Sequence, residues 1–174
     1  MIETALQRSE QWPDDIDWEG LAQKAAIEAI RRTPHGDLID RTVAVEISIR
    51  LTDDDEVHTL NRQYRDKDRP TNVLSFPMVQ PDMLDGLANS DDGEVLLGDL
   101  VLAAGVCRSE AEEKGIALAD HAAHLLVHGV LHLLGYDHER GEADAEAMEA
   151  LECEALAAMG IADPYRMPPS LDEV

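Results

Sequence analysis

The sequence predicts an α+β fold, in which helices cover a small mixed β-sheet. Residues 42–51 alternate apolar and polar side chains, which is typical of a half-buried strand. Two shorter apolar runs, 73–76 and 96–103, also fit strands, whereas longer segments repeat their apolar residues every three or four positions, as helices do. Because helices and strands alternate only in part and the strands are few, a small mixed sheet is favoured.

The first part of the chain is expected to contain two helices. Residues 1–16 are polar and are expected to form a loose N-terminal segment. Residues 17–33 have the apolar spacing of an amphipathic helix, which Pro34 ends. Thr52 and the three aspartates after it provide an N-cap and an acidic first turn, so residues 53–65 are predicted to be a helix.

The second part is expected to be mainly helical. Residues 78–94 are rich in Asp, Gly, Pro and Asn and form the longest predicted loop. A short helix or turn is predicted at 105–114, and longer helices are predicted at 120–134 and 141–159. We expect residues 17–160 to form a single domain and residues 161–174 to form a C-terminal tail.

The composition is strongly acidic, since 14 Lys and Arg accompany 37 Asp and Glu and the net charge is −23. Such a surface should repel a polyanion, which argues against general binding of nucleic acid but allows a local basic groove. No signal peptide is visible, and the longest apolar stretch is too short to span a bilayer. Two cysteines without a Cys-x-x-Cys pair favour a reduced, cytoplasmic setting, and no membrane partner is expected.

The run from His128 to His138 predicts a metal site. His128 and His132 are four residues apart, so on a helix they lie about 40° apart on one face. Gly135 can adopt a positive φ and end the helix, after which the chain can turn back and deliver His138 as a third nitrogen. Three histidines leave a fourth tetrahedral position open, as in catalytic zinc sites. The sequence therefore predicts a metal site on a central helix and the turn after it, with a metal that activates water.

The spacing of this run matches the H-E-x-x-H-x-x-G-x-x-H pattern of metzincin proteases at every position but one. Gly129 stands where those enzymes have the glutamate that takes the proton from metal-bound water. This departure argues against proteolysis and favours another metal-assisted hydrolysis. A metzincin-like metallopeptidase that takes its base from elsewhere stays open as an alternative.

Residues 61–69 form a second unusual run, with four of the fourteen basic residues in nine positions. Charge alone explains it as the end of a solvated helix, where cations favour the C-terminal dipole. Together, however, the metal run and the segment Arg65–Pro77 (Arg-Asp-Lys-Asp-Arg-Pro-Thr-Asn-Val-Leu-Ser-Phe-Pro) strongly resemble the YbeY family of bacterial endoribonucleases. The similarity also includes Leu97-Gly-Asp-Leu and Ala123-His124, and it spans about residues 40–140.

The resemblance implies a helix-covered sheet and one zinc ion, Zn2+, held by His128, His132 and His138. It also implies an endoribonuclease directed at single strands, which acts in ribosomal RNA maturation at the 3′ end of the small-subunit rRNA and in ribosome quality control. Residues 17–160 would then be a metal-dependent hydrolase domain. The expected partners are ribosomal RNA and ribosomal or ribosome-associated proteins, one of which would present the RNA to so acidic a chain.

Through the resemblance, the basic run takes on a role in the reaction. A family arginine tied to activity corresponds to Arg65, which we interpret as a clamp on the phosphate or the transition state. Lys67 and Arg69 are interpreted as contacts with the RNA backbone.

Two further residues beside the metal run are candidates for supporting roles. His124, one turn before His128, and Asp137 are expected to orient the ligands rather than bind the metal. The sequence does not identify the general base, for which Asp99, Asp137 and Glu139 are candidates. A non-catalytic, zinc-containing ribosome-assembly factor is a further alternative, in which the acidic surface docks basic ribosomal proteins.

Overall fold

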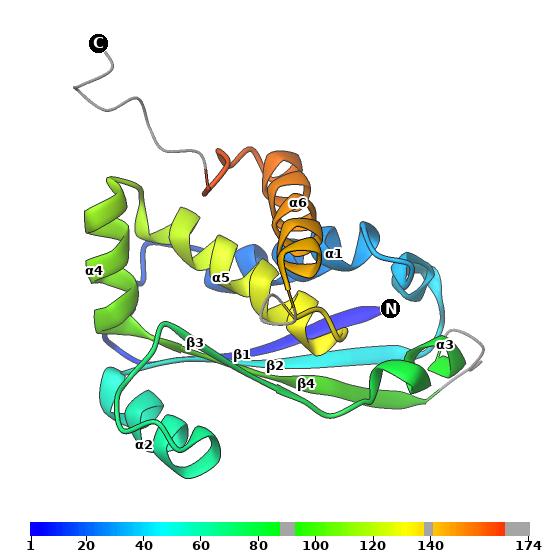
Figure 1. The fold of residues 1–174 in the computed structure, drawn as a ribbon, viewed down its shortest axis with the longest axis horizontal. Helices are drawn as coiled ribbons and strands as arrows, with labels where there is room; N and C mark the ends of the chain where they lie inside the picture. Colours follow the sequence, from blue (N-terminus) through cyan, green and yellow to red (C-terminus); the bar gives the residue numbers. More distant parts are fainter. Residues whose placement is uncertain (88–92, 138–140, 166–174) are drawn as a thin grey trace.

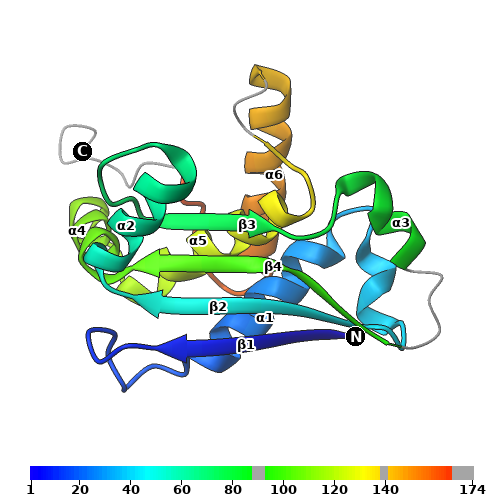
Figure 2. The same cartoon turned by 90° about the horizontal axis from the view of Figure 1, so that it is seen from below.

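The computed structural model describes residues 1–87, 93–137 and 141–165. It confirms the α+β fold, with a four-stranded mixed sheet and helices on both of its faces (Figure 1). The strands are β1 (Ile2–Arg8), β2 (Ala44–Thr52), β3 (Val73–Pro77) and β4 (Glu94–Ala103). They lie in the order β1-β2-β4-β3, which Figure 2 shows from below. β1, β2 and β4 are parallel, and β3 is antiparallel to β4.

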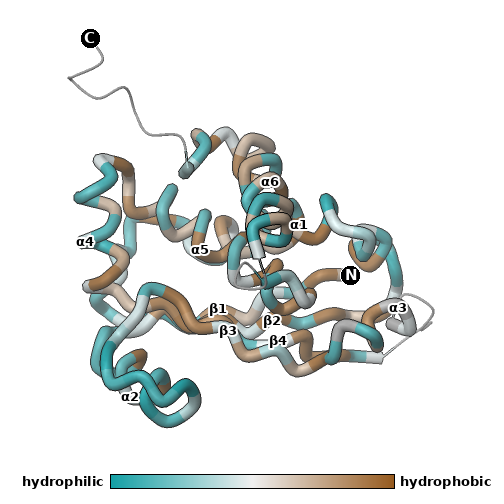
Figure 3. Tube along the Cα trace, in the orientation of Figure 1, coloured by the Kyte–Doolittle hydropathy of each residue, from teal (hydrophilic) through white to brown (hydrophobic). Residues whose placement is uncertain are grey.

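The longer helices divide between the two faces of the sheet. α1 (Trp18–Arg31), α5 (Leu118–Leu133) and α6 (Glu142–Ala158) lie on one face, and α2 (Asp54–Arg65) lies on the other (Figure 1). α2 is hydrophilic along most of its length, in keeping with its exposed position (Figure 3). α4 (Ala104–Lys114) follows β4 and packs against α5. The predicted helices therefore form close to the expected positions.

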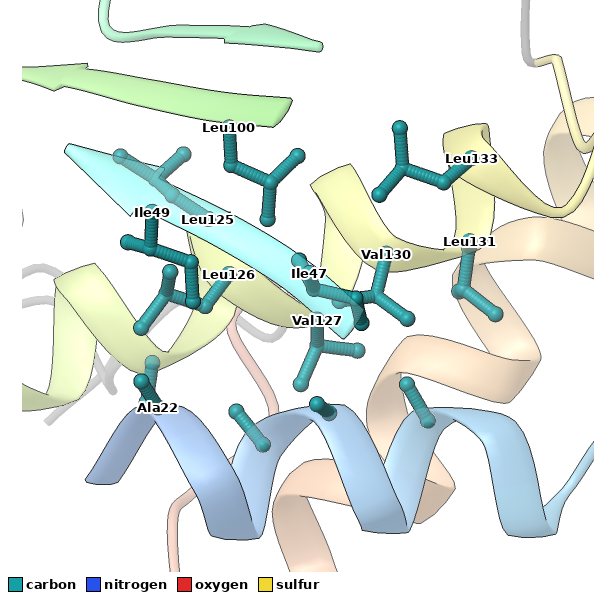
Figure 4. Close-up of a cluster of buried hydrophobic side chains, with 14 of the residues drawn as sticks. Ala22, Ile47, Ile49, Leu100, Leu125, Leu126, Val127, Val130, Leu131 and Leu133 are labelled. Carbon is teal, nitrogen blue, oxygen red and sulfur yellow. The ribbon is translucent and has the colours of Figure 1, made fainter. Parts of the chain in front are cut away.

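The core lies between the sheet and α1, with α5 in the middle (Figure 4). Leu126, Val127 and Val130 of α5 are buried, as are Ile47 of β2 and Ala22 of α1. A continuous apolar layer therefore fixes α5 over the sheet, and with it the histidines that α5 carries.

Two glycines let α5 and its C-terminus approach β4 closely. A β-carbon added at Gly129 of α5 would lie 2.7 Å from Cδ2 of Leu100. One added at Gly98 of β4 would lie 2.5 Å from Cδ2 of Leu133 and 2.6 Å from the backbone oxygen of Phe76. Gly129, which departs from the metzincin pattern, thus faces the sheet at a place where a larger side chain overpacks the core.

The prediction that residues 1–16 form a loose segment is wrong. Ile2–Arg8 is strand β1, which pairs with β2 along its whole length, and Trp12 beyond it is buried. β1 is an edge strand with one solvent-facing side, so its outward residues Glu3, Ala5 and Gln7 make the segment look polar. The weak alternation of Ile2, Thr4 and Leu6 on its inner side was the signal for a strand.

Short helical turns and a packed C-terminal segment also differ from the sequence-based expectation. Short helical turns occur at η1 (Gly36–Asp40), η2 (Pro81–Met83) and α3 (Leu84–Leu87), the last two within the predicted loop 78–94. The predicted tail 161–174 is wrong at its start, because Ile161 packs against the core and Tyr165 contacts α6. The rest of that tail, residues 166–174, lies outside the described residues.

Within the described ranges, no single helix is long and apolar enough to span a membrane. α4 and α5 meet the criteria of length and composition only as a pair, and they are bent by 113° at the break between them.

Candidate active site

A groove of about 630 Å³ lies where α5 passes the edge strand β3. Its lining combines both motifs singled out in the sequence, although they are far apart along the chain. Residues from α5 and the turn after it line one wall: His128, Gly129, His132, Gly135, Tyr136 and Asp137. Residues from α2, the following loop and β3 line the other: Asn61, Arg65, Lys67, Arg69, Thr71, Asn72, Val73, Leu74, Ser75 and Pro77.

α5 presents His128 and His132 to the groove one helical turn apart. Their Nε2 atoms are 3.0 Å apart, with the rings nearly perpendicular at 83°. Two imidazole nitrogens that bind one tetrahedral zinc ion lie about 3.3 Å from each other, given Zn–N bonds of about 2.0–2.1 Å. The two ring nitrogens therefore fit a shared cation.

α5 ends in the way that the sequence predicted. Gly135 adopts a φ of 99°, and the amide of Tyr136 donates to the backbone oxygen of Leu131 in the pattern of a Schellman cap. His138, the predicted third ligand, lies outside the described residues, as does Glu139. Across the described parts of the chain, no group of three or more His, Cys, Asp or Glu side chains is placed to hold a metal.

A carboxylate that sequence reasoning missed lies behind the two histidines. Glu152 of α6 is fully buried and accepts hydrogen bonds at Oε1 from His128 Nδ1 (2.7 Å) and His124 Nε2 (3.2 Å). Its Oε2 accepts from the hydroxyl of Tyr165 (2.8 Å). Burial raises the pKa of Glu152, but the hydrogen bonds from His124, His128 and Tyr165, together with the positive charge of His128, lower the pKa to about 2. Glu152 is therefore an ionised acceptor in the interior.

A signal for Glu152 was present in the sequence. The apolar face of α6 includes Met148 and Ala155, both buried, and Glu152 lies four residues after the first and three before the second. A carboxylate on the apolar face of a helix requires donors from elsewhere in the fold. Tyr165 carried no comparable signal, because it falls in a segment that was expected to be a tail.

The structure places His124 behind the groove. Its Nε2 faces Glu152 Oε1 and lies 3.2 Å from the hydroxyl of Tyr165, and its ring is nearly buried. Asp137 lies on the groove wall and also lines a second cavity of about 290 Å³ behind the turn. The orienting roles expected for His124 and Asp137 stay predictions. Asp99, half-buried on β4, is not among the residues that line either cavity.

The opposite wall is formed by a basic loop after α2. Asp66, whose φ is 56°, caps the C-terminus of α2, and the loop is held by the buried Asn61. The side-chain amide of Asn61 donates to the backbone oxygen of Arg69 (2.8 Å), and the backbone oxygen of Asn61 accepts from the backbone amide of Lys67 (3.2 Å). The side chains of Lys67 and Arg69 are exposed, so the loop backbone is fixed while its cations face solvent.

Arg65 is at the rim of the groove, at the last residue of α2. Its Nη2 donates to the backbone oxygen of Ser75 (2.5 Å), and its guanidinium lies 5.6 Å from the centre of the Phe76 ring. Both contacts are made with the edge strand β3. They orient a planar cation beside the groove into which His128 and His132 project, an arrangement that suits a phosphodiester between cation and arginine.

This chain is similar to one protein family over most of its length. The family described as Endoribonuclease YbeY matches residues 8–160. A protein named Endoribonuclease YbeY from Rhizorhabdus wittichii is 64% identical over 165 residues, with 95% of this chain and 97% of the relative covered. Proteins of the same name from Sphingopyxis alaskensis and Zymomonas mobilis are 56% and 48% identical, each over 95% of this chain and over 98% and 93% of their own lengths.

A solved structure supports the fold. The solution structure of TM1509 from Thermotoga maritima has a TM-score of 0.54 and covers 95% of this chain and 99% of its own. At 23% identity, this likeness concerns the fold alone.

Proposed function

Because this chain belongs to the Endoribonuclease YbeY family, we propose that it is a zinc-dependent endoribonuclease that cleaves single-stranded RNA. Its proposed task is the maturation of ribosomal RNA, at the 3′ end of the small-subunit rRNA, together with ribosome quality control. The observation that carries the proposal is the groove itself. One wall has two imidazole nitrogens 3.0 Å apart, and the other has Arg65 and the basic loop.

In this proposal the zinc ion is held by His128, His132 and His138. A zinc ion held there would supply the acidity that brings the pKa of a water molecule toward neutrality, so that hydroxide would be available at neutral pH. Arg65 binds the phosphate and stabilises the extra negative charge of the transition state. Its contact with the oxygen of Ser75 holds the guanidinium in place before the substrate arrives, which reduces the reorganisation needed on binding.

The basic loop gives the RNA a local attraction on an otherwise acidic protein. Lys67 and Arg69 point to solvent from a loop fixed by Asn61, and they would contact backbone phosphates on either side of the cleaved bond. The net charge of −23 opposes long-range attraction of RNA, so we propose that a basic ribosomal or ribosome-associated protein presents the substrate. Such a substrate would be met in the cytoplasm.

The two rival functions receive less support from the geometry. A metallopeptidase would need its base from a position other than 129, because Gly129 has no side chain and a β-carbon added there would lie 2.7 Å from Cδ2 of Leu100. A non-catalytic assembly factor does not need an open groove beside the cation, with an oriented arginine at its rim.

The decisive experiment compares three substrates with one zinc-loaded preparation. We expect cleavage of a single-stranded RNA from the 3′ end of the small-subunit rRNA, no cleavage of the same RNA in a duplex, and no cleavage of a peptide mixture. A chelator should abolish cleavage and added zinc should restore it. His132→Ala, prepared in parallel, controls for a contaminating nuclease, and cleavage that persists in that variant would contradict the proposal. Cleavage of peptides instead of RNA would favour the metallopeptidase.

A further inference from the structure

A buried negative charge lies directly behind the groove. Glu152 is fully buried, and within the described ranges its hydrogen-bond donors are two imidazoles and a phenol. Burying a carboxylate costs several kcal/mol unless hydrogen bonds compensate it. Within a chain that already has 37 acidic residues, the placement of this carboxylate in the interior calls for a specific reason.

The reason is found at His128. A neutral imidazole has one nitrogen that donates and one that accepts. The Nδ1 atom of His128 lies 2.7 Å from a carboxylate oxygen, which accepts, so His128 donates from Nδ1 and its lone pair is on Nε2. That Nε2 is the atom that lies 3.0 Å from Nε2 of His132. The carboxylate thus selects the tautomer that directs a lone pair into the groove.

The carboxylate is itself held from its other side. The hydroxyl of Tyr165 donates to Oε2 at 2.8 Å, and Nε2 of His124 donates to Oε1 at 3.2 Å. The rings of His124 and Tyr165 pack edge to face with centres 5.3 Å apart. Glu152 therefore has little freedom to rotate away from His128.

We propose that Glu152 is a positioning residue for the cation site, with Tyr165 and His124 holding it in place. It fixes the Nδ1–H tautomer and the ring orientation of His128, so that Nε2 is presented to the cation. This role rests on the proposed metal-dependent function, and it predicts an effect on metal affinity and ligand geometry. Loss of a carboxylate that orients a ligand histidine weakens metal binding by about 10- to 100-fold.

The test uses the full chain and measures metal binding instead of RNA cleavage. Metal-free wild type, Glu152→Gln, Tyr165→Phe and Glu154→Gln are titrated with Zn2+ against a chromophoric chelator. Glu152→Gln preserves volume but removes the charge, and Glu154, exposed on the same helix, gives the matched control. We expect the zinc Kd to rise by about 10- to 100-fold in Glu152→Gln, by less in Tyr165→Phe, and not at all in Glu154→Gln.

Two spectroscopic measurements separate positioning from a merely structural role. The visible absorption bands of the cobalt-loaded protein should shift in Glu152→Gln at saturating metal, because His128 is no longer fixed. In metal-free wild type, nitrogen-15 NMR of the imidazoles should show His128 protonated at Nδ1, a result that needs no variant and tests the inference even if Glu152→Gln fails to fold.

An unchanged Kd and unchanged cobalt bands in folded Glu152→Gln, or an Nε2–H tautomer of His128 in wild type, would overturn the inference. Failure of the proposed function has a different signature. A protein that binds zinc through a correctly oriented His128 but leaves RNA uncleaved contradicts the nuclease proposal and keeps the role of Glu152.

Discussion

The two walls of the groove differ in burial and in what holds their polar side chains. On the α5 wall, His128 is hydrogen-bonded to the buried Glu152, which His124 also contacts, so its orientation is set by hydrogen bonds inside the protein. On the opposite wall, Arg65, Lys67 and Arg69 are exposed, and contacts fix the loop backbone and the guanidinium of Arg65. Substitutions in the two walls should therefore have separable effects. Those on the α5 wall should abolish zinc binding, whereas those on the opposite wall should weaken the cleavage or binding of RNA.

The largest effect is expected from His128→Ala or His132→Ala. Either change removes a predicted ligand from a site of three, so zinc should no longer be bound in stoichiometric amount and RNA cleavage should stop. Elemental analysis of the purified variants measures the zinc content. His58→Ala, which changes an exposed histidine paired with Asp68, is the control and should keep one equivalent. A full equivalent of zinc in both ligand variants would mean that the cation lies elsewhere.

Arg65→Ala should have the next largest effect. Loss of a charged group that stabilises the transition state lowers kcat by about 100- to 1,000-fold, while zinc content and thermal stability should stay as in wild type. Arg65→Lys should recover only part of the rate, because an ammonium group lacks the planar fork of donors. Arg62→Ala on the same helix is the control. If Arg65→Ala cleaves at the wild-type rate, the arginine takes no part in the reaction.

Gly129→Ala sharpens the comparison, because it should lower the stability of the fold without removing a group that contacts zinc or RNA. The new β-carbon would lie 2.7 Å from Leu100 Cδ2, so the helix or the leucine must shift. Overpacking of this kind costs about 1–3 kcal/mol in the free energy of unfolding, which urea denaturation measures. Gly86→Ala, where a β-carbon meets nothing within 4 Å, is the matched control. Equal stability of the two variants would show that Leu100 moves aside without cost.

The smallest effects are expected from Lys67→Ala and Arg69→Ala. Each should weaken binding of single-stranded RNA modestly and lower the slope of log K against log salt by about 0.7, as one phosphate contact is lost. Fluorescence anisotropy at several salt concentrations measures both quantities, with Lys114→Ala on α4 as the control. An unchanged salt dependence would place the RNA backbone away from this loop.

The parts of the fold that rest on local patterns were predictable. α5 forms at Leu118–Leu133 against a predicted 120–134, because apolar periodicity and the glycine cap act within a few turns. The pairing of His128 with His132 follows from the same helix geometry.

The parts that depend on distant partners were missed. β1 is stabilised by pairing with β2, about forty residues away, and its outward side gives no apolar signal. Glu152 is compatible with the interior only because His124, His128 and Tyr165 supply donors, and no local pattern shows that they will meet. Tertiary contacts of this kind can bury a polar side chain even where the local sequence favours an exposed position.

The order of these residues along the chain has a consequence for synthesis. The acceptor that orients His128 follows it by 24 residues, and the hydroxyl that holds this acceptor comes 13 residues later still. Since chains emerge from the ribosome N-terminus first, α5 can dock on its sheet before α6 is available. A nascent chain that stops short of Glu152 would then carry the proposed metal ligands without their internal support, so we expect the proposed cleavage activity to mature only after Tyr165 has been synthesised.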